Sequence, residues 1–128
     1  MNIDNYIGIP WESGGRRIKG CDCVGLVALV ARDIFGYETE NIEETCEWWN
    51  SEKDINLIKD VATLVDKPQP GDVLVFTCMS NIHTGIFIEP NRVLLMFRGG
   101  TSRGVRYSDG LRKRTISIYR GVRKCHQQ

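Results

Sequence analysis

Apolar residues recur along this chain with two different periods, and the period changes just past the middle. Over residues 23–35 the apolar side chains return at helical spacing, which predicts an amphipathic helix. Asp22 stands where a helix N-cap belongs, and Gly36 stands where a helix commonly ends. Residues 41–65 carry a second helical pattern, interrupted near its middle, while the glycine-rich residues 1–20 read as loop and turn.

Beyond residue 71 short runs of β-branched and aromatic residues alternate with turn residues, which is typical of antiparallel strands. The runs expected to form strands are Val73–Thr77, Thr84–Ile88, Val93–Phe97, Gly104–Tyr107 and Thr115–Tyr119. Helices followed by successive strands indicate the α+β class. We expect N-terminal helices packed on a C-terminal antiparallel sheet of about five strands, in one domain covering residues 1–128.

The net charge of +1 hides an uneven distribution. Residues 1–91 hold seven Lys and Arg against fifteen Asp and Glu, whereas residues 92–128 hold ten against Asp109 alone. A basic segment is one signature of a nucleic-acid binder, but such proteins gather the charge on one face. Here the arginines are interleaved with apolar residues in a strand pattern, so we expect no nucleic-acid partner and keep that role only as a third hypothesis.

No apolar run approaches the roughly 18 residues that a membrane-spanning helix needs. The first residues, Met1–Asn5, lack the basic and apolar regions of a signal peptide, so we expect synthesis in the cytoplasm and no membrane association. Five cysteines are an odd number, which favours reduced thiols. The spacing of Cys21 and Cys23 does not match the common zinc motifs, so we expect no metal and no cofactor.

Two residues carry candidate chemistry. Cys23 falls in the first turn of the predicted helix, where unpaired N–H groups and the helix dipole stabilise a thiolate. His83 opens an apolar run sixty residues later. If the two meet in the fold, they form the nucleophile and general base of a thiol hydrolase or transferase, with the helix N–H groups holding the oxyanion. Taken singly, each also fits a structural role, Cys23 as a buried thiol and His83 as a donor to a loop carbonyl.

Four segments, in this order, resemble the NlpC-type cysteine peptidases, a papain-like family that cleaves the stem peptides of bacterial cell walls. The segments are Ile9–Gly15 (IPWESGG), Cys21–Val27 (CDCVGLV), Gln69–Phe76 (QPGDVLVF) and His83–Ile88 (HTGIFI). They are similar to that family's Pro-aromatic-x-x-Gly-Gly, Asp-Cys-Ser-Gly-Leu-Val, Pro-Gly-Asp-Leu and His-Val-Gly-Ile motifs. The ending Ile118–Gly121 also resembles the close of compact versions found in phage tail-tip assembly. The resemblance covers nearly the whole chain and implies a papain-like NlpC-type fold.

The resemblance implies that Cys23 is the nucleophile and His83 the general base. Trp11 stands where the family usually has tyrosine, Asp22 precedes the nucleophile, and Arg98 lies close to the site in sequence. We expect these three residues to support the site or to bind substrate.

One departure concerns the polar residue that orients the imidazole in the family. Its position falls here on Leu95 or Met96, and neither side chain can accept the ring N–H of His83. In addition, Val24 replaces the usual serine beside the nucleophile.

The resemblance implies hydrolysis of peptidoglycan stem peptides, at the γ-D-glutamyl–diamino-acid bond that the family favours. The alternative is a catalytically weakened or inactive structural component of a phage tail tip with the same fold. The expected partners are a peptidoglycan peptide and phage tail proteins. The protein would then act from the virion or after release by lysis.

Overall fold

The computed structural model describes residues 2–39, 62–78 and 81–121. Where a loop was expected at the start of the chain, a short 3-10 helix η1 (Ile3–Tyr6) is followed by a small antiparallel pair, β1 (Arg16–Arg17) and β2 (Gly20–Cys21). Helix α1 (Cys23–Asp33) comes next. No described helix is both long and apolar enough to cross a membrane.

The predicted helix at residues 23–35 is confirmed as α1, with its ends marked as expected. The side chain of Asp22 caps the helix by accepting the Gly25 N–H at 2.7 Å. Gly36 follows the C-terminal end with φ of +70°, a left-handed conformation that glycine adopts at little cost. Every residue from 24 to 31 is buried, so α1 is a core helix and not a surface one.

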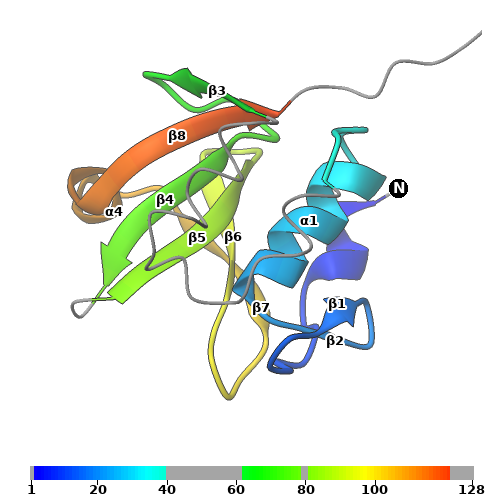
Figure 1. Cartoon of the computed structure of the whole chain (residues 1–128). Coiled ribbons are helices and arrows are strands. Elements are labelled where there is room, and N and C mark those ends of the chain that lie inside the picture. The colour runs from blue at the N-terminus through cyan, green and yellow to red at the C-terminus, as the bar shows by residue number, and fades with distance from the viewer. Residues whose placement is uncertain (1, 40–61, 79–80, 122–128) are drawn as a thin grey trace, which may run out of the picture.

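Six strands form one antiparallel sheet in the order β3-β8-β4-β5-β6-β7 (Figure 1). Their bounds are β3 Ala62–Val65, β4 Val73–Cys78, β5 Asn81–Ile88, β6 Arg92–Met96, β7 Ser102–Arg106 and β8 Thr115–Gly121. A second short helix, α4 (Asp109–Arg114), connects β7 to β8. Each of the five predicted strands is present, and no end differs from the prediction by more than three residues.

Two further elements, β3 and α4, differ from the sequence-based expectation. The end of the predicted helical range 41–65 is strand β3, because residues 62–65 pair with β8 at the edge of the sheet, and tertiary pairing outweighs local propensity. The rest of that range up to residue 61 lies outside the described residues. Helix α4 occupies a segment expected to be a turn, and Ser108 caps it by accepting the Leu111 N–H. Six residues are too few to show a helical period in the sequence.

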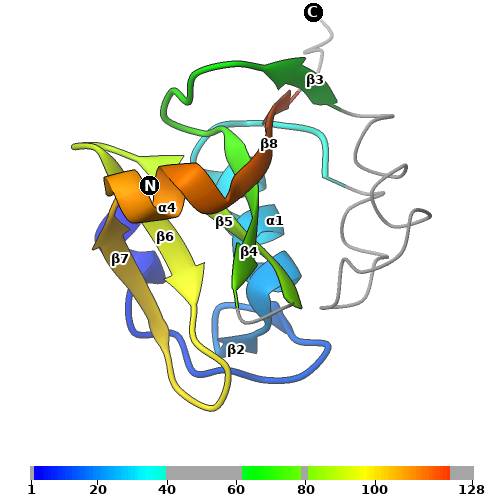
Figure 2. The same ribbon diagram turned by 90° about the vertical axis from the view of Figure 1, so that its left-hand side faces the viewer.

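The sheet is covered on both faces, by α1 on one side and by α4 on the other (Figure 2). Two clusters of buried side chains result. The α1-side cluster includes Val73, Val75, Ile86, Ile88, Leu94 and Met96. The α4-side cluster comprises Leu74, Phe76, Phe87, Val93, Leu111 and Ile118. Successive residues of β4, β5 and β6 therefore alternate between the two clusters.

The residues of the Pro-Gly-Asp motif, Pro70 to Asp72, form the turn that leads the chain into β4. Gly71 has φ of +98°, which suits glycine alone. The buried Asp72 carboxylate accepts the backbone N–H of Gln69 at 2.8 Å and two bonds from the Arg120 guanidinium at 2.9 and 3.0 Å. The motif thus forms a turn, and the ion pair between Asp72 and Arg120 attaches this turn to β8.

The N-terminal segment is fastened to the opposite edge strand. The buried Ser102 hydroxyl donates to the Tyr6 carbonyl at 2.6 Å and accepts the Ile9 N–H at 2.9 Å. Backbone bonds of 2.9 Å from Gly8 N to Ser102 O and from Trp11 N to Gly100 O continue this contact. The loop that precedes α1 is thereby held against the end of β6 and the start of β7.

Candidate functional site

The Cys23 thiol sits on the first residue of α1. It forms no disulfide, is half-buried and packs against the α1-side cluster. The first N–H groups of a helix have no intrahelical carbonyl to bond, and they carry the positive end of the helix dipole. The fold therefore places a partly accessible thiol where a negative charge is stabilised.

Asp22 organises the helix start from a fully buried position. Its carboxylate accepts hydrogen bonds from the N–H groups of Gly14 and Gly25, at 3.0 and 2.7 Å. It also forms an ion pair with Arg16 at 2.7 Å. Gly25 allows this arrangement, because a Cβ there would lie 2.2 Å from the Gly15 carbonyl oxygen. Asp22 thus acts as cap and anchor of the preceding loop and holds Cys23 at a fixed place.

Cys21 lies two residues before Cys23 and has a different environment. It is completely buried, and burial, with the Asp22 charge as a smaller cause, raises its pKa to about 12. The Cys21 thiol consequently stays protonated at neutral pH and is shielded from reagents. Of the two cysteines in this motif, only Cys23 is placed to react.

Trp11 and Arg98 are brought together beside the start of α1. The Arg98 guanidinium lies 5.4 Å from the centre of the Trp11 ring, within range of a cation–π contact. Trp11 also forms a backbone bridge to Cys21, which places it next to the loop that carries Asp22 and Cys23. The sequence-predicted supporting residues Trp11, Asp22 and Arg98 therefore lie on a connected part of the structure.

His83 faces the α4 side of the sheet. It pairs with Phe76 across β4 and β5, and the two rings stack with centres 6.0 Å apart. Phe76 belongs to the α4-side cluster. Ile82 and Ile86 lie one and three positions from His83, so they point to the opposite face of the strand, and both pack on the α1 side. Burial lowers the pKa of His83 below its usual 6.5, so the imidazole is neutral at neutral pH.

The two members of the predicted pair pack with different clusters of buried side chains. Cys23 packs on the α1 side, whereas the His83 imidazole stacks on Phe76, a member of the α4-side cluster. Leu95 lies on the His83 side, since a Cβ on Gly85 would come 2.3 Å from the Leu95 Cδ2 atom. Met96 instead belongs to the α1-side cluster. Leu95 therefore occupies the place beside His83 that an orienting polar residue would take.

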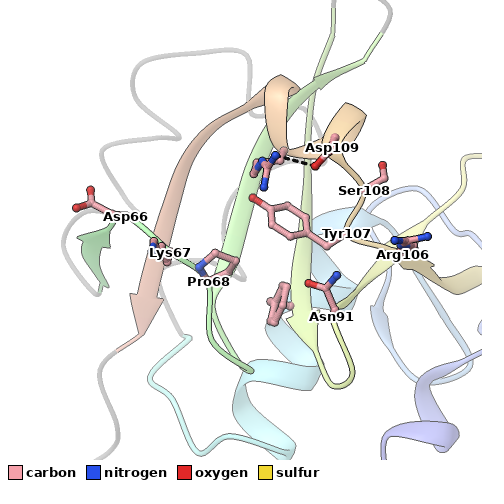
Figure 3. Close-up of a pocket in the computed structure, with 10 residues that line it drawn as sticks. Asp66, Lys67, Pro68, Asn91, Arg106, Tyr107, Ser108 and Asp109 are labelled. Atoms are coloured by element: carbon pink, nitrogen blue, oxygen red, sulfur yellow. Dashed lines mark hydrogen bonds and ion pairs between the residues drawn. The ribbon is translucent and has the colours of Figure 1, made fainter.

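Several hollows open on the α4 side of the sheet, among them the following two. One, of about 370 Å³, is lined by His83, Leu95 and Arg98 together with residues of β7 and α4. The other, of about 620 Å³, lies around Tyr107 and the Asp109–Arg112 ion pair (Figure 3). None of the sequence-predicted site residues lines the larger hollow.

No group of three or more His, Cys, Asp and Glu side chains within the described ranges could hold a metal ion. Cys46, Cys125 and His126 lie outside those ranges.

The sequence of the chain matches a known protein family. The sequence model of the NlpC/P60 family matches residues 8–120, which is most of the chain. This chain belongs to the NlpC/P60 family. The match includes the helix start with Cys23 and strand β5 with His83, and it confirms the resemblance drawn from the four motifs.

Two curated relatives of this NlpC/P60 chain carry different names. Tail tip assembly protein K of Escherichia phage N15 is 28% identical over 107 residues, which is 77% of this chain and 44% of the relative. The probable endopeptidase NlpC of Escherichia coli K12 is 26% identical over 108 residues, which is 80% of this chain and 60% of the relative. The chain thus spans about half the length of these relatives.

Solved structures of other NlpC/P60 proteins share the fold. NlpC1 from Trichomonas vaginalis superposes with a TM-score of 0.59 at 15% identity, covering 93% of this chain and 41% of that one. An NLP/P60 family protein similar to lipoprotein, from Staphylococcus aureus, superposes with a TM-score of 0.56 at 19% identity, covering 95% and 40%. The α+β NlpC-type fold predicted from the sequence is confirmed by these likenesses.

The sequence alone did not identify the residues of β7 and α4 that line the smaller hollow. These include Arg106, Leu111 and Arg114. The charge count contained a signal, because ten of the seventeen basic residues lie beyond residue 91. It could not show which of them converge, since α4 was not expected.

Proposed function

We propose that this chain is a cysteine peptidase that hydrolyses peptidoglycan stem peptides, with Cys23 as the nucleophile. The observation that carries the proposal is the half-buried Cys23 thiol on the first residue of a helix whose start is fixed by a buried cap. Membership of a family in which one curated relative is named a probable endopeptidase supports it.

In the proposed reaction the Cys23 thiolate attacks the carbonyl carbon of the scissile amide. The N–H groups at the start of α1 stabilise the oxyanion that forms. His83 takes the thiol proton and gives it to the leaving amine, after which water hydrolyses the thioester. The lowered pKa of His83 keeps the imidazole unprotonated at neutral pH, as the first step requires. This role also requires the start of β5 to present the imidazole to the α1 side.

The direct test is a digest of purified muropeptides, with the wild-type protein compared with Cys23→Ala. We expect product from the wild type and none from the variant. Cys78→Ala is the matched control, because Cys78 is also half-buried, forms no disulfide and lies on β4, away from the helix start. Equal product from the wild type and Cys23→Ala would remove Cys23 from the mechanism. If only the wild type gives product, the masses of the fragments show whether cleavage falls at the γ-D-glutamyl–diamino-acid bond.

A second candidate function is assembly of a phage tail without hydrolysis. The packing of His83 against Phe76 favours this alternative, because it places the imidazole on the α4 side of the sheet, with the apolar Leu95 on the same side. The relative from phage N15 is named a tail tip assembly protein. This function predicts a stable complex with phage tail proteins that survives Cys23→Ala, together with no muropeptide product from the wild type.

For either function we propose action at the virion or after release by lysis. Detection of the chain in purified virions by mass spectrometry tests the first route. Absence from virions combined with appearance in the lysate supports the second.

A further inference from the structure

The smaller hollow on the α4 side has an apolar interior. Phe76, Leu95, Val105 and Leu111 line it, and they come from β4, β6, β7 and α4 respectively. Phe76 and Leu111 are buried members of the α4-side cluster. A volume of about 370 Å³ lies within the range of small-molecule sites, which are commonly apolar inside with a few polar groups at the mouth.

The charged groups around this hollow are all of one sign. Arg98, Arg106 and Arg114 line it, and no Asp or Glu is among the described residues that do. Arg106 and Arg114 are exposed, and neither forms an ion pair with any described residue. His83, the remaining titratable base of the lining, is held neutral by its burial. The mouth therefore presents positive charge above an apolar interior.

We propose that this hollow binds a small organic acid, with its hydrocarbon body among Phe76, Leu95 and Leu111 and its carboxylate at Arg106 and Arg114. Removal of apolar surface from water would supply the binding free energy. Arginine suits the anionic group, since its planar guanidinium can donate two parallel hydrogen bonds to a carboxylate. The site does not depend on the proposed hydrolysis, because it uses neither Cys23 nor any turnover.

The larger hollow does not share this selectivity. Asp66 and Asp109 line it together with Lys67, Arg112 and Arg106, which lines both hollows, and Asp109 already engages Arg112 at 2.7 Å (Figure 3). With both signs present, it has no clear preference for an anion.

Octanoate, octanol and acetate separate the apolar contribution from the charged one. Binding to the full-length protein is measured by titration in ¹H–¹⁵N NMR spectra, with the amide signals of Leu95, Val105 and Leu111 as reporters. We expect octanoate to bind about tenfold more tightly than octanol, the ratio that roughly one charge-assisted interaction produces. Acetate, which lacks the apolar body, should cause no saturable shifts.

Matched arginine variants locate the carboxylate. Arg106→Gln combined with Arg114→Gln should weaken octanoate binding about tenfold and leave octanol binding unchanged. Arg112→Gln is the control, because Arg112 lies on the same helix as Arg114 and does not line the smaller hollow. Equal affinity for octanoate and octanol, shifts that map elsewhere, or equal weakening by Arg112→Gln would each overturn the proposal. Because no turnover is measured, these results do not depend on whether the peptidase proposal holds.

Discussion

At the scale of single residues, the two cysteines of the motif Cys21-Asp22-Cys23 should differ sharply in reactivity. Burial raises the pKa of Cys21 to about 12, while Cys23 is half-buried at a helix start. We expect iodoacetamide to alkylate Cys23 at a pH well below the reference thiol pKa of about 8.5 and to leave Cys21 unmodified in the folded protein. Alkylation rates resolved by mass spectrometry across pH provide the measurement.

The same experiment on His83→Ala tests the proposed pair. If the imidazole reaches the thiol in solution, the variant should need a higher pH for alkylation of Cys23. An unchanged pH profile would show that His83 does not act on Cys23, and the assembly function would then be preferred. Cys21 provides an internal control for unfolding, because it becomes reactive only when the core opens.

His83 should also make stability depend on pH on the acidic side. Burial lowers its pKa in the folded state below the unfolded value of about 6.5, so protonation is easier in the unfolded chain. Its contribution to the free energy of unfolding is present above pH 6.5 and is lost as the pH falls through the folded pKa. NMR titration of the ring protons should give a pKa below 6.5, and Phe76→Ala should raise it by admitting water. A pKa at or above 6.5 in the wild type would contradict the described packing.

The residue scale also shows why the orientation of His83 could not be predicted. A strand with one face in water alternates apolar and polar residues, and that alternation reveals which face each residue takes. Strand β5 is covered by α1 and α4, so both Ile86 and Phe87 are buried and the alternation disappears. In contrast, Asp22 was predicted correctly as a cap, because capping depends on neighbours in the sequence.

At the scale of elements, the start of α1 depends on one carboxylate. Asp22→Ala removes the acceptor for the Gly14 and Gly25 N–H groups and the carboxylate that pairs with Arg16. We expect it to lower the free energy of unfolding by about 2–3 kcal/mol, more than a simple cap substitution, because buried N–H groups lose their acceptor. Urea denaturation provides the measurement.

Asp22→Asn separates the two contributions of this residue. Asparagine keeps a side-chain oxygen for the cap but loses the charge that pairs with Arg16. It should therefore cost less than Asp22→Ala. If both variants are equally destabilised, the ion pair and not the cap dominates; if neither is, the carboxylate is not the anchor that its contacts indicate.

Elements with strong local signals were predictable, and elements defined by distant contacts were not. Helix α1 and strands β4 to β8 follow from periodicity and turn residues, which act over a few positions. Strand β3 exists because Ala62–Val65 meet β8, more than fifty residues further along the chain. Helix α4 is shorter than the window over which a helical period can be recognised.

At the scale of the whole molecule, Ser102 connects the first residues of the chain to β7, the strand at one edge of the sheet. Ser102→Ala deletes one bond to the Tyr6 carbonyl and one to the Ile9 N–H in a buried setting. We expect a loss of about 1–3 kcal/mol in the free energy of unfolding, and faster amide exchange in η1 and residues 8–11. Ser117→Ala on β8 is the control, because no side-chain hydrogen bond to a described residue is recorded for Ser117. Unchanged exchange in residues 8–11 would show that the backbone bonds alone hold the segment.

The attachment of the N-terminal segment has a consequence for contacts between molecules. Strand β7 is an outer strand of the sheet, and the exposed N–H and C=O groups of such a strand can pair with another chain. Residues 8–11 cover the beginning of this edge by bonding residues 100–102, and Arg103 and Arg106 place charge along the remainder. The N-terminal segment therefore protects the protein against aggregation through its sheet edge, and a chain that loses this segment would expose a template for strand addition.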